Sequence, residues 1–405
     1  MLKPSLIISL LLSSFNLFAK PGLPSDSSLL DSLVKKKTFL LTNGNFNGPG
    51  WDMLRDEIKK VQFVMVGEQH GMAEIPYFTG KIADDFKPKA LVIEIDPYSA
   101  EALKKLALKP DTWPAYFKER PYDMAFYSWQ TEMELARKMQ LQNIDIWGLN
   151  EINFLGMERF FTDLAALTKS ADNKKWALSM AKTYKEHDKP IFTDEKRFGE
   201  FAAYTLKAAT IDSMVTRFHN ESPASKRMLN NLKLSIPAFA NNYPMRVNLM
   251  KRNLLNYLSP IQTKDSISLP KLLFKFGANH VSRSKDMLRV YEMGNLADNL
   301  ADAANKKTLH ILIAGKQGTS NFMAPVNNSE AIKPYIWVKD DDLSSLHYFY
   351  NQVKENQWVI FDLRPLRSAL ERNKIQIKDP DLKKFITGFD VIVFFDKVSG
   401  NKFIE

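Results

Sequence analysis

The sequence contains no cysteine and only 6 histidines among its 405 residues. Without cysteine the chain has no thiol nucleophile, no thiolate-bound zinc or iron–sulfur site and no disulfide framework. Any metal ion that it holds must therefore be ligated by histidine and carboxylate groups. The hydrophobic fraction of 45% and the charged fraction of 25% are typical of a globular protein, and the length suits one large domain or two of ordinary size.

Motifs that mark several common enzyme classes are also missing. The sequence has no G-x-S-x-G nucleophile elbow, no H-E-x-x-H zinc helix and no G-x-x-x-x-G-K-[ST] phosphate loop. The formal net charge of +10 is spread along the chain instead of being concentrated in a basic arm, and no nucleic-acid motif accompanies it. We therefore expect a solvated basic surface and no nucleic-acid partner.

The N-terminus has the pattern of a secretory signal peptide. Lys3 precedes an apolar run over Leu6–Leu12, and the small residue Ala19 stands just before Lys-Pro-Gly. The apolar run is too short for a membrane-spanning helix, which needs about 20 residues. The sequence predicts removal of residues 1–19, a mature domain over residues 20–405 in the periplasm or outside the cell, and no stable membrane insertion afterwards. The alternative is that the segment stays in place as a membrane anchor.

Seven short apolar runs predict strands that are buried on both faces of a sheet. They cover residues 61–67, 90–95, 144–149, 272–277, 308–314, 358–363 and 389–395. Helix-like patterns separate these runs, so we expect an α/β fold with a central, mostly parallel or mixed sheet flanked by helices. No strand pattern occurs at about residues 152–260, which predicts a helical insertion subdomain there.

Acidic and imidazole side chains follow four of these predicted strands. Glu68 and His70 lie in a glycine-flanked turn after the first run, Glu94 ends the second, Glu151 follows the third and His280 follows the fourth. The carboxyl ends of parallel strands face the crevice where α/β proteins bind ligands, so we expect one crevice to collect these groups. The alternative is that each side chain caps a strand end or belongs to a buried polar pair.

These motifs resemble those of the erythromycin esterase-like proteins, a branch of a superfamily that also contains the haem-binding ChaN-like proteins and the TraB/TIKI proteases. The resemblance rests on an ordered set over about residues 60–396: GEQHG at 67–71, LVIE at 91–94, R-x-x-x-M-x-x-N at Arg246, Met250 and Asn253, GANHV at 277–281, and FDLR at 361–364. One spacing differs from the esterases. Only Gln69 separates Glu68 from His70, where the esterases have two residues, and this spacing is closer to the ChaN-like branch.

The resemblance implies a hydrolase, an esterase acting on a small molecule, in which His70 is the general base toward water; the N-terminal pattern adds the expectation that it is exported. The residues that it implies for catalysis are His70, Glu68, Glu94, His280 and Arg246. Glu151, Asn279 and Asn253 are then expected on the substrate side, and no metal or other cofactor is required. The chemistry is consistent, because imidazole accepts a proton near neutral pH and a guanidinium group stabilises an oxyanion. Macrolides are a narrower expectation, since a fold family does not fix the substrate.

Three other interpretations stay open at the level of sequence. His70, Glu68, Glu94 and His280 suffice as ligands for zinc or manganese in a metal-dependent hydrolase. The ChaN-like spacing allows an exported binding protein for haem or another large planar ligand. A non-catalytic relative with the same fold is the third interpretation, although burying ionisable groups without use is costly. The sequence does not fix the oligomeric state.

Overall fold

The structure is a computed structural model that describes residues 27–405, apart from residues 193, 262–267, 322–331 and 338–342. The expected signal peptide, residues 1–19, lies outside the described residues. Within the described part of the chain, no helix is both long enough and apolar enough to cross a membrane.

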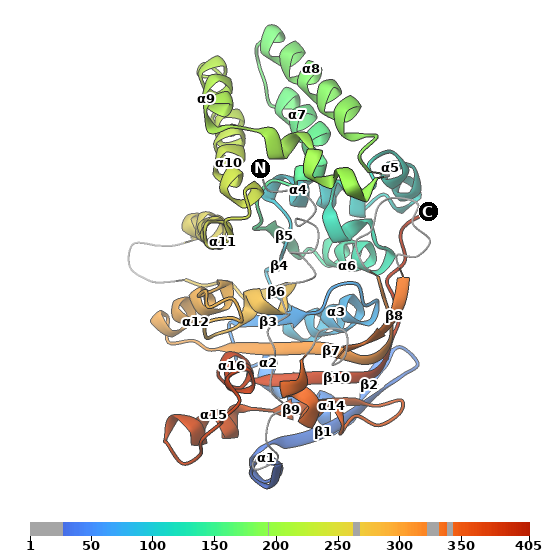
Figure 1. Ribbon diagram of the computed structural model, residues 1–405, viewed down its shortest axis with the longest axis vertical. Helices are drawn as coiled ribbons and strands as arrows, with labels where there is room; N and C mark the ends of the chain where they lie inside the picture. The colour runs from blue at the N-terminus through green and yellow to red at the C-terminus, as the bar shows by residue number, and fades with distance from the viewer. Residues whose placement is uncertain (1–26, 193, 262–267, 322–331, 338–342) are drawn as a thin grey trace.

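A ten-stranded mixed sheet forms the centre of the described chain (Figure 1). Its order is β2-β1-β9-β10-β7-β3-β6-β4-β5, and β8 pairs with β7. The strands are β1 (Lys35–Thr42), β2 (Asn45–Asn47), β3 (Phe63–Glu68), β4 (Ala90–Ile93), β5 (Asp145–Gly148), β6 (Leu272–Gly277), β7 (Thr308–Asn321), β8 (Ile332–Ile336), β9 (Trp358–Asp362) and β10 (Val391–Val398). Neighbours from β10 to β5 are parallel, whereas β8, β9, β1 and β2 join antiparallel.

This architecture confirms the predicted α/β fold with a mixed, mainly parallel sheet. Each of the seven predicted runs overlaps a strand, namely β3, β4, β5, β6, β7, β9 and β10. The runs are continuously apolar because both faces of these strands are covered, and every residue of β3 and β9 is buried. The sequence patterns did not predict β1, β2 and β8, whose residues are mostly exposed.

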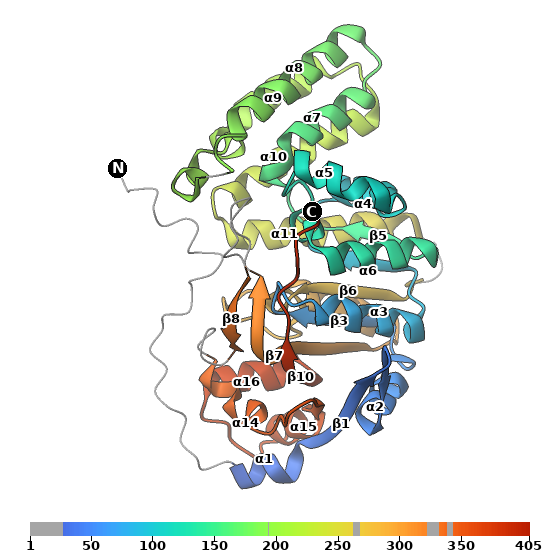
Figure 2. The same cartoon turned by 90° about the vertical axis from the view of Figure 1, so that its right-hand side faces the viewer.

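Helices cover both faces of the sheet. They are α1 (Ser27–Leu33), α2 (Pro49–Ile58), α3 (Glu74–Phe86), α4 (Pro97–Ala107), α5 (Trp113–Glu119), α6 (Gln130–Leu141), α12 (Met293–Ala303), α14 (His347–Tyr350), α15 (Arg364–Glu371) and α16 (Pro380–Gly388). Helices α2, α3, α6 and α4 contact one another in that order. Figure 2 shows α2, α3 and α6 on the opposite side of the sheet from α14, α15 and α16.

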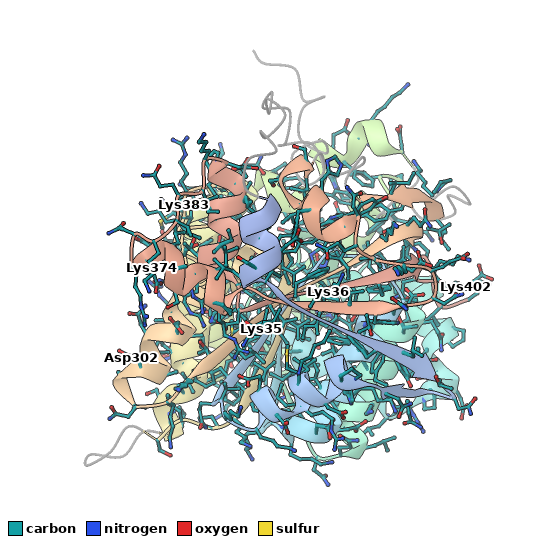
Figure 3. All side chains as sticks on the ribbon, turned by 90° about the horizontal axis from the view of Figure 1, so that it is seen from below. Lys35, Lys36, Asp302, Lys374, Lys383 and Lys402 are labelled. Carbon is teal, nitrogen blue, oxygen red and sulfur yellow. The ribbon has the colours of Figure 1, made fainter. Side chains whose placement is uncertain are left out.

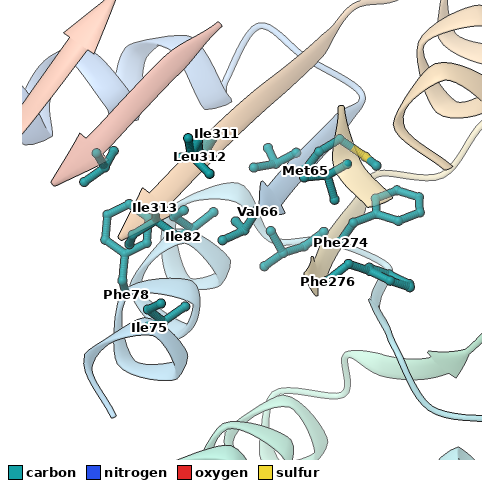
Figure 4. Close-up of a cluster of buried hydrophobic side chains, with 14 of the residues drawn as sticks. Met65, Val66, Ile75, Phe78, Ile82, Phe274, Phe276, Ile311, Leu312 and Ile313 are labelled. Atoms are coloured by element: carbon teal, nitrogen blue, oxygen red, sulfur yellow. The ribbon is translucent and has the colours of Figure 1, made fainter. Parts of the chain in front are cut away.

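One part of the core lies where α3 packs on the central strands (Figure 4). Ile75, Phe78 and Ile82 recur at intervals of three and four residues along α3, so they share one helix face, and all three are fully buried. They meet fully buried side chains of the central strands, such as Val66 and Ile313. This packing fixes α3 against the strands and therefore fixes the turn that connects β3 to α3.

Between β5 and β6 the chain leaves the sheet and forms a helical lobe, at the top of Figure 1. Its helices are α7 (Met157–Ala166), α8 (Ala171–Asp188), α9 (Ala208–Arg217), α10 (Pro223–Phe239) and α11 (Tyr243–Leu258). The lobe has a buried cluster of its own that includes Phe161, Phe218 and Leu232. Met250 and Leu254 of α11 belong instead to the core of the sheet, so α11 joins the lobe to the sheet.

Lysines are distributed over several elements of the surface. Seen from below, the exposed Lys35 and Lys36 lie on β1, and the exposed Lys374 and Lys383 lie around α15 and α16 (Figure 3). The net charge of +10 is therefore not concentrated in a single element.

The order of the strands places a candidate site. Strand β6 lies between β3 and β4 although it follows both in the sequence, so the direction of the crossovers reverses at this point. In α/β sheets, ligands bind outside the carboxyl ends of the strands at such a switch point. Here those ends are at Glu68, Ile93 and Gly277.

Candidate active site

The turn after β3 holds His70 against a carboxylate and an aromatic ring. His70 Nδ1 lies 3.0 Å from Oε1 of Glu68, the last residue of β3, and its ring stacks on Phe126 with the centroids 4.1 Å apart. Gly71 follows with φ of 91°, and a Cβ there would lie 2.0 Å from the carbonyl oxygen of Asn321. Only glycine fits this position, so the turn has a fixed shape. The His70 side chain keeps 32% of its surface exposed, which leaves it open to a ligand.

Glu94, directly after β4, is the centre of the site. Its Oε1 accepts from Arg246 Nη2 at 2.9 Å and lies 3.2 Å from His280 Nε2. Its Oε2 accepts from the backbone N–H of Gly277 at 2.9 Å and lies 3.6 Å from His70 Nε2. Burial raises the pKa of this carboxyl, but the charges of His280 and Arg246 outweigh burial and hold the pKa well below its usual range. Glu94 is therefore an anion at neutral pH.

His280 is held between two carboxylates. It lies on the short helix η9 (Ala278–Val281) after β6, and its Nδ1 is 2.9 Å from Oε2 of the fully buried Glu292. Burial lowers the pKa of His280, but Glu94 and Glu292 reverse this and raise it to about 10. His280 is therefore charged at neutral pH and donates from both nitrogens. Its 3.2 Å contact with Arg246 Nη1 then joins two donors and is not a hydrogen bond.

Arg246 connects the helical lobe to the site. From α11 its Nε donates to Glu151 at 2.9 Å, and its Nη2 donates to Glu94 and to Asn150 Oδ1, each at 2.9 Å. These ion pairs raise the pKa of the guanidinium despite burial, so it is permanently charged. Within the described residues, Arg246 Nη1 contacts the charged His280, which is itself a donor. The N–H groups of Nη1 are therefore available to a ligand.

The two asparagines expected on the substrate side lie in different surroundings. Asn279 is half-buried on η9 beside His280. Asn253 is buried on α11, and its amide donates to the carbonyl oxygen of Leu149 at 2.7 Å. Asn253 thus fixes the chain after β5, just before Glu151. Glu151 keeps 18% of its side-chain surface exposed next to Arg246.

Four further side chains complete the site and were missed from the sequence. Lys275 of β6 is buried and donates to Glu68 Oε1 and to Glu132 Oε1, each at 2.6 Å. Glu292, immediately before α12, also accepts from the hydroxyl of Tyr243 at 2.6 Å. Lys275 could have been identified from the sequence. A charged residue inside the apolar run LLFKFG is as costly to bury as Glu94 at the end of the second run. Glu132, Glu292 and Tyr243 lie in ordinary helical or loop sequence and give no such signal.

Carboxylate oxygens of the site already accept from cationic or backbone donors, which does not suit a divalent metal ion. Both oxygens of Glu94 already accept from cationic or backbone donors, and Glu68 Oε1 accepts from Lys275. Within the described residues, no group of three or more histidine and carboxylate side chains is arranged to hold a metal ion. Haem iron needs a free imidazole nitrogen, and His280 offers none because both of its nitrogens face carboxylates.

Comparison with known proteins supports the fold and goes no further. No family model matches the chain, and no curated protein matches it. Among solved structures, a mutant of the erythromycin esterase EreC in its open conformation superposes with a TM-score of 0.54 at 11% identity, covering 92% of this chain and 100% of that one. A Bacillus cereus protein gives 0.54 at 18% identity (94% and 98% covered), and a succinoglycan biosynthesis protein gives 0.52 at 14% (95% and 100%). The chain therefore has the erythromycin esterase-like fold.

Proposed function

We propose that the protein is an exported, metal-independent hydrolase that cleaves an ester bond of a small molecule with water. The observation that carries the proposal is the 3.6 Å separation between His70 Nε2 and Glu94 Oε2. This separation is too long for a direct hydrogen bond, but it allows one water beside the pair to donate to both atoms. The expectation of export rests on the sequence pattern of residues 1–19.

In the proposed reaction, this water attacks the ester carbonyl carbon while His70 Nε2 takes one of its protons. Glu68 accepts from Nδ1–H, which fixes the tautomer and stabilises the imidazolium that forms. The carbonyl oxygen becomes an oxyanion, which the N–H groups of Arg246 Nη1 and the charge of His280 stabilise. The C–O bond of the tetrahedral intermediate then breaks, and His70 returns the proton to the leaving alkoxide.

The roles of the two imidazoles follow from their partners. His280 holds its proton between Glu94 and Glu292 up to a pKa of about 10, so it supplies positive charge and cannot be the base at neutral pH. His70 has one carboxylate at Nδ1 and is open at Nε2, as a general base requires. Glu151 and Asn279 are partly exposed beside these groups, and we assign them to contact with the substrate. Macrolide lactones are one ester class to test.

The test is hydrolysis of a panel of aryl, alkyl and lactone esters by the wild-type protein and by His70→Asn. A positioned base contributes about 10² to 10⁴ in rate, so we expect a loss of that size. His219→Asn is the matched control, because His219 is exposed on the helical lobe. We also expect EDTA to leave the rate unchanged. The proposal fails if no ester is hydrolysed, or if His70→Asn is as active as the control variant.

A further inference from the structure

A buried chain of charged side chains leads away from His70 on the side opposite its open Nε2. His70 Nδ1 lies 3.0 Å from Glu68 Oε1, and the same oxygen accepts from Lys275 Nζ at 2.6 Å. Lys275 Nζ in turn donates to Oε1 of Glu132 on α6, again at 2.6 Å. The chain therefore runs from the proposed base through two carboxylates and one ammonium group to a helix of the neighbouring layer.

The far end of this chain is unusual. Glu68, Glu132 and Lys275 are all buried, with 4%, 2% and 4% of their surfaces exposed. In the described structure Oε2 of Glu132 has no hydrogen-bond partner. A buried carboxylate with one orphaned oxygen is costly, and replacing such an ion-paired cluster by apolar residues is often stabilising. Stability alone therefore does not account for a second carboxylate on Lys275.

The charged and titratable groups around His70 come from several elements, whereas β7 contributes only the polar Ser320, whose hydroxyl donates to the His70 carbonyl oxygen. They are Glu68 on β3, Glu94 after β4, Lys275 on β6, Glu132 on α6, Tyr127 on the short helix η4 (Ala125–Ser128), His280 on η9 and Arg246 on α11. Glu94, His280 and Arg246 form one ion-paired set on the Nε2 side. Glu68, Lys275 and Glu132 form the other set, on the Nδ1 side.

We propose that Glu132 and Lys275 are positioning residues that set the proton affinity of His70 through Glu68. This inference rests on the proposed role of His70 as the base. With both carboxylates ionised the triad Glu68–Lys275–Glu132 has one net negative charge, which favours the imidazolium that forms when His70 takes a proton. When Glu132 is neutral, Lys275 cancels Glu68, and that support is lost.

The electrostatics of Glu132 agree with such a role. Burial raises its pKa to about 7, against the opposing charge of Lys275 and with a further contribution from Glu68. Glu132, at the far end of this series of charged side chains, therefore changes its charge in the pH range where an imidazole also titrates. The charged groups interact strongly, so the pKa values describe the set as a whole and a bound proton is not assigned to one residue.

The test is the titration of His70 itself, which does not require any activity. The protein is labelled with ¹⁵N-histidine, and the His70 imidazole signals are assigned by their loss in His70→Asn. Glu132→Gln removes the outer negative charge, so we expect the pKa of His70 to fall by about one unit, a tenfold loss of proton affinity. Lys275→Met removes the cation, so the pKa is expected to rise. Glu134→Gln is the matched control, because Glu134 is exposed on the same helix.

A double variant guards against misfolding of the single ones. Glu132→Gln with Lys275→Met removes one charge of each sign, leaves Glu68 as the single anion, and is expected to return the pKa of His70 toward the wild-type value. Equal values in all variants would overturn the proposal, as would single variants that shift in the same direction. If the expected shifts appear but no ester is hydrolysed, the charge chain stands and the hydrolase proposal fails.

Discussion

The pairing of His280 with Glu292 provides a direct test of the charges assigned to the site. Glu292 is fully buried and accepts from His280 Nδ1 and from the Tyr243 hydroxyl. Glu292→Gln keeps the shape and an acceptor oxygen for Tyr243 but removes one of the two negative charges that face the imidazolium. The variant therefore reports how much of the stability of the fold depends on that charge.

The magnitude follows from the pKa of His280. A rise from 6.5 to about 10 corresponds to roughly 5 kcal/mol of differential stabilisation. Burial lowers this pKa, so the two carboxylates together contribute more than the net rise; if Glu94 and Glu292 contribute equally, the variant loses at least about 2 to 3 kcal/mol. Because the folded pKa is raised, this stabilisation is fully present below about pH 6.5 and is lost as the pH rises toward 10. The difference between wild type and variant must shrink in the same way.

Equilibrium urea unfolding between pH 6.5 and pH 9.5 measures this difference. Starting at pH 6.5 keeps most of Asp286 ionised, since burial and Glu292 raise its pKa to about 6. Glu101→Gln, at an exposed site on α4, is the control and is expected to change the free energy of unfolding by less than about 0.5 kcal/mol at every pH. A loss in Glu292→Gln that is the same at pH 6.5 and pH 9.5 refutes the charged state of His280.

Two glycines give further predictions. Gly71→Ala places a Cβ at positive φ and 2.0 Å from the carbonyl oxygen of Asn321. We expect the free energy of unfolding, measured with heat or urea, to fall by at least about 1 to 3 kcal/mol. A variant as stable as the wild type would contradict the fixed shape of this turn. Gly277→Ala adds a Cβ 3.0 Å from His70 Nε2 and 3.4 Å from Glu94 Oε2. It should lower kcat of ester hydrolysis and leave the unfolding midpoint nearly unchanged, and full activity would show that no water is needed between His70 and Glu94.

The strands of the sheet were predictable from sequence where both faces are buried. The run at 389–395 is mostly apolar because β10 lies between β7 and β9 and all but one of its residues are buried. Exposed strands give a different pattern. The sequence KKKTFLLT of β1 has one buried residue, Phe39, and β8 contains Pro334, which is tolerated at a sheet edge. These strands are held by their neighbours, and that information is not local.

The candidate site was predictable in its strand-end groups and not in their partners. Gly-flanked turns and charges in apolar runs identified His70 and Glu94, because those features are costly without a use. Glu132 pairs with Lys275 across 143 positions in sequence, so no spacing rule connects them. Asn253 shows that a motif can indicate the position of a residue without indicating what its side chain contacts. A motif placed it near the site, but the motif does not say whether the amide faces the substrate or the backbone of Leu149.

Glu94 explains why the two imidazoles of one crevice have different chemistry. Its Oε1 is shared by Arg246 and His280, and this concentration of positive charge keeps it ionised. The ionised Glu94, together with Glu292, keeps the proton on His280. The side of Glu94 that faces His70 has a single backbone donor, Gly277, and a separation of 3.6 Å from Nε2. One carboxylate therefore locks one imidazole as a cation and presents the other with a second acceptor, an arrangement that suits the proposed attack by a water that donates to both.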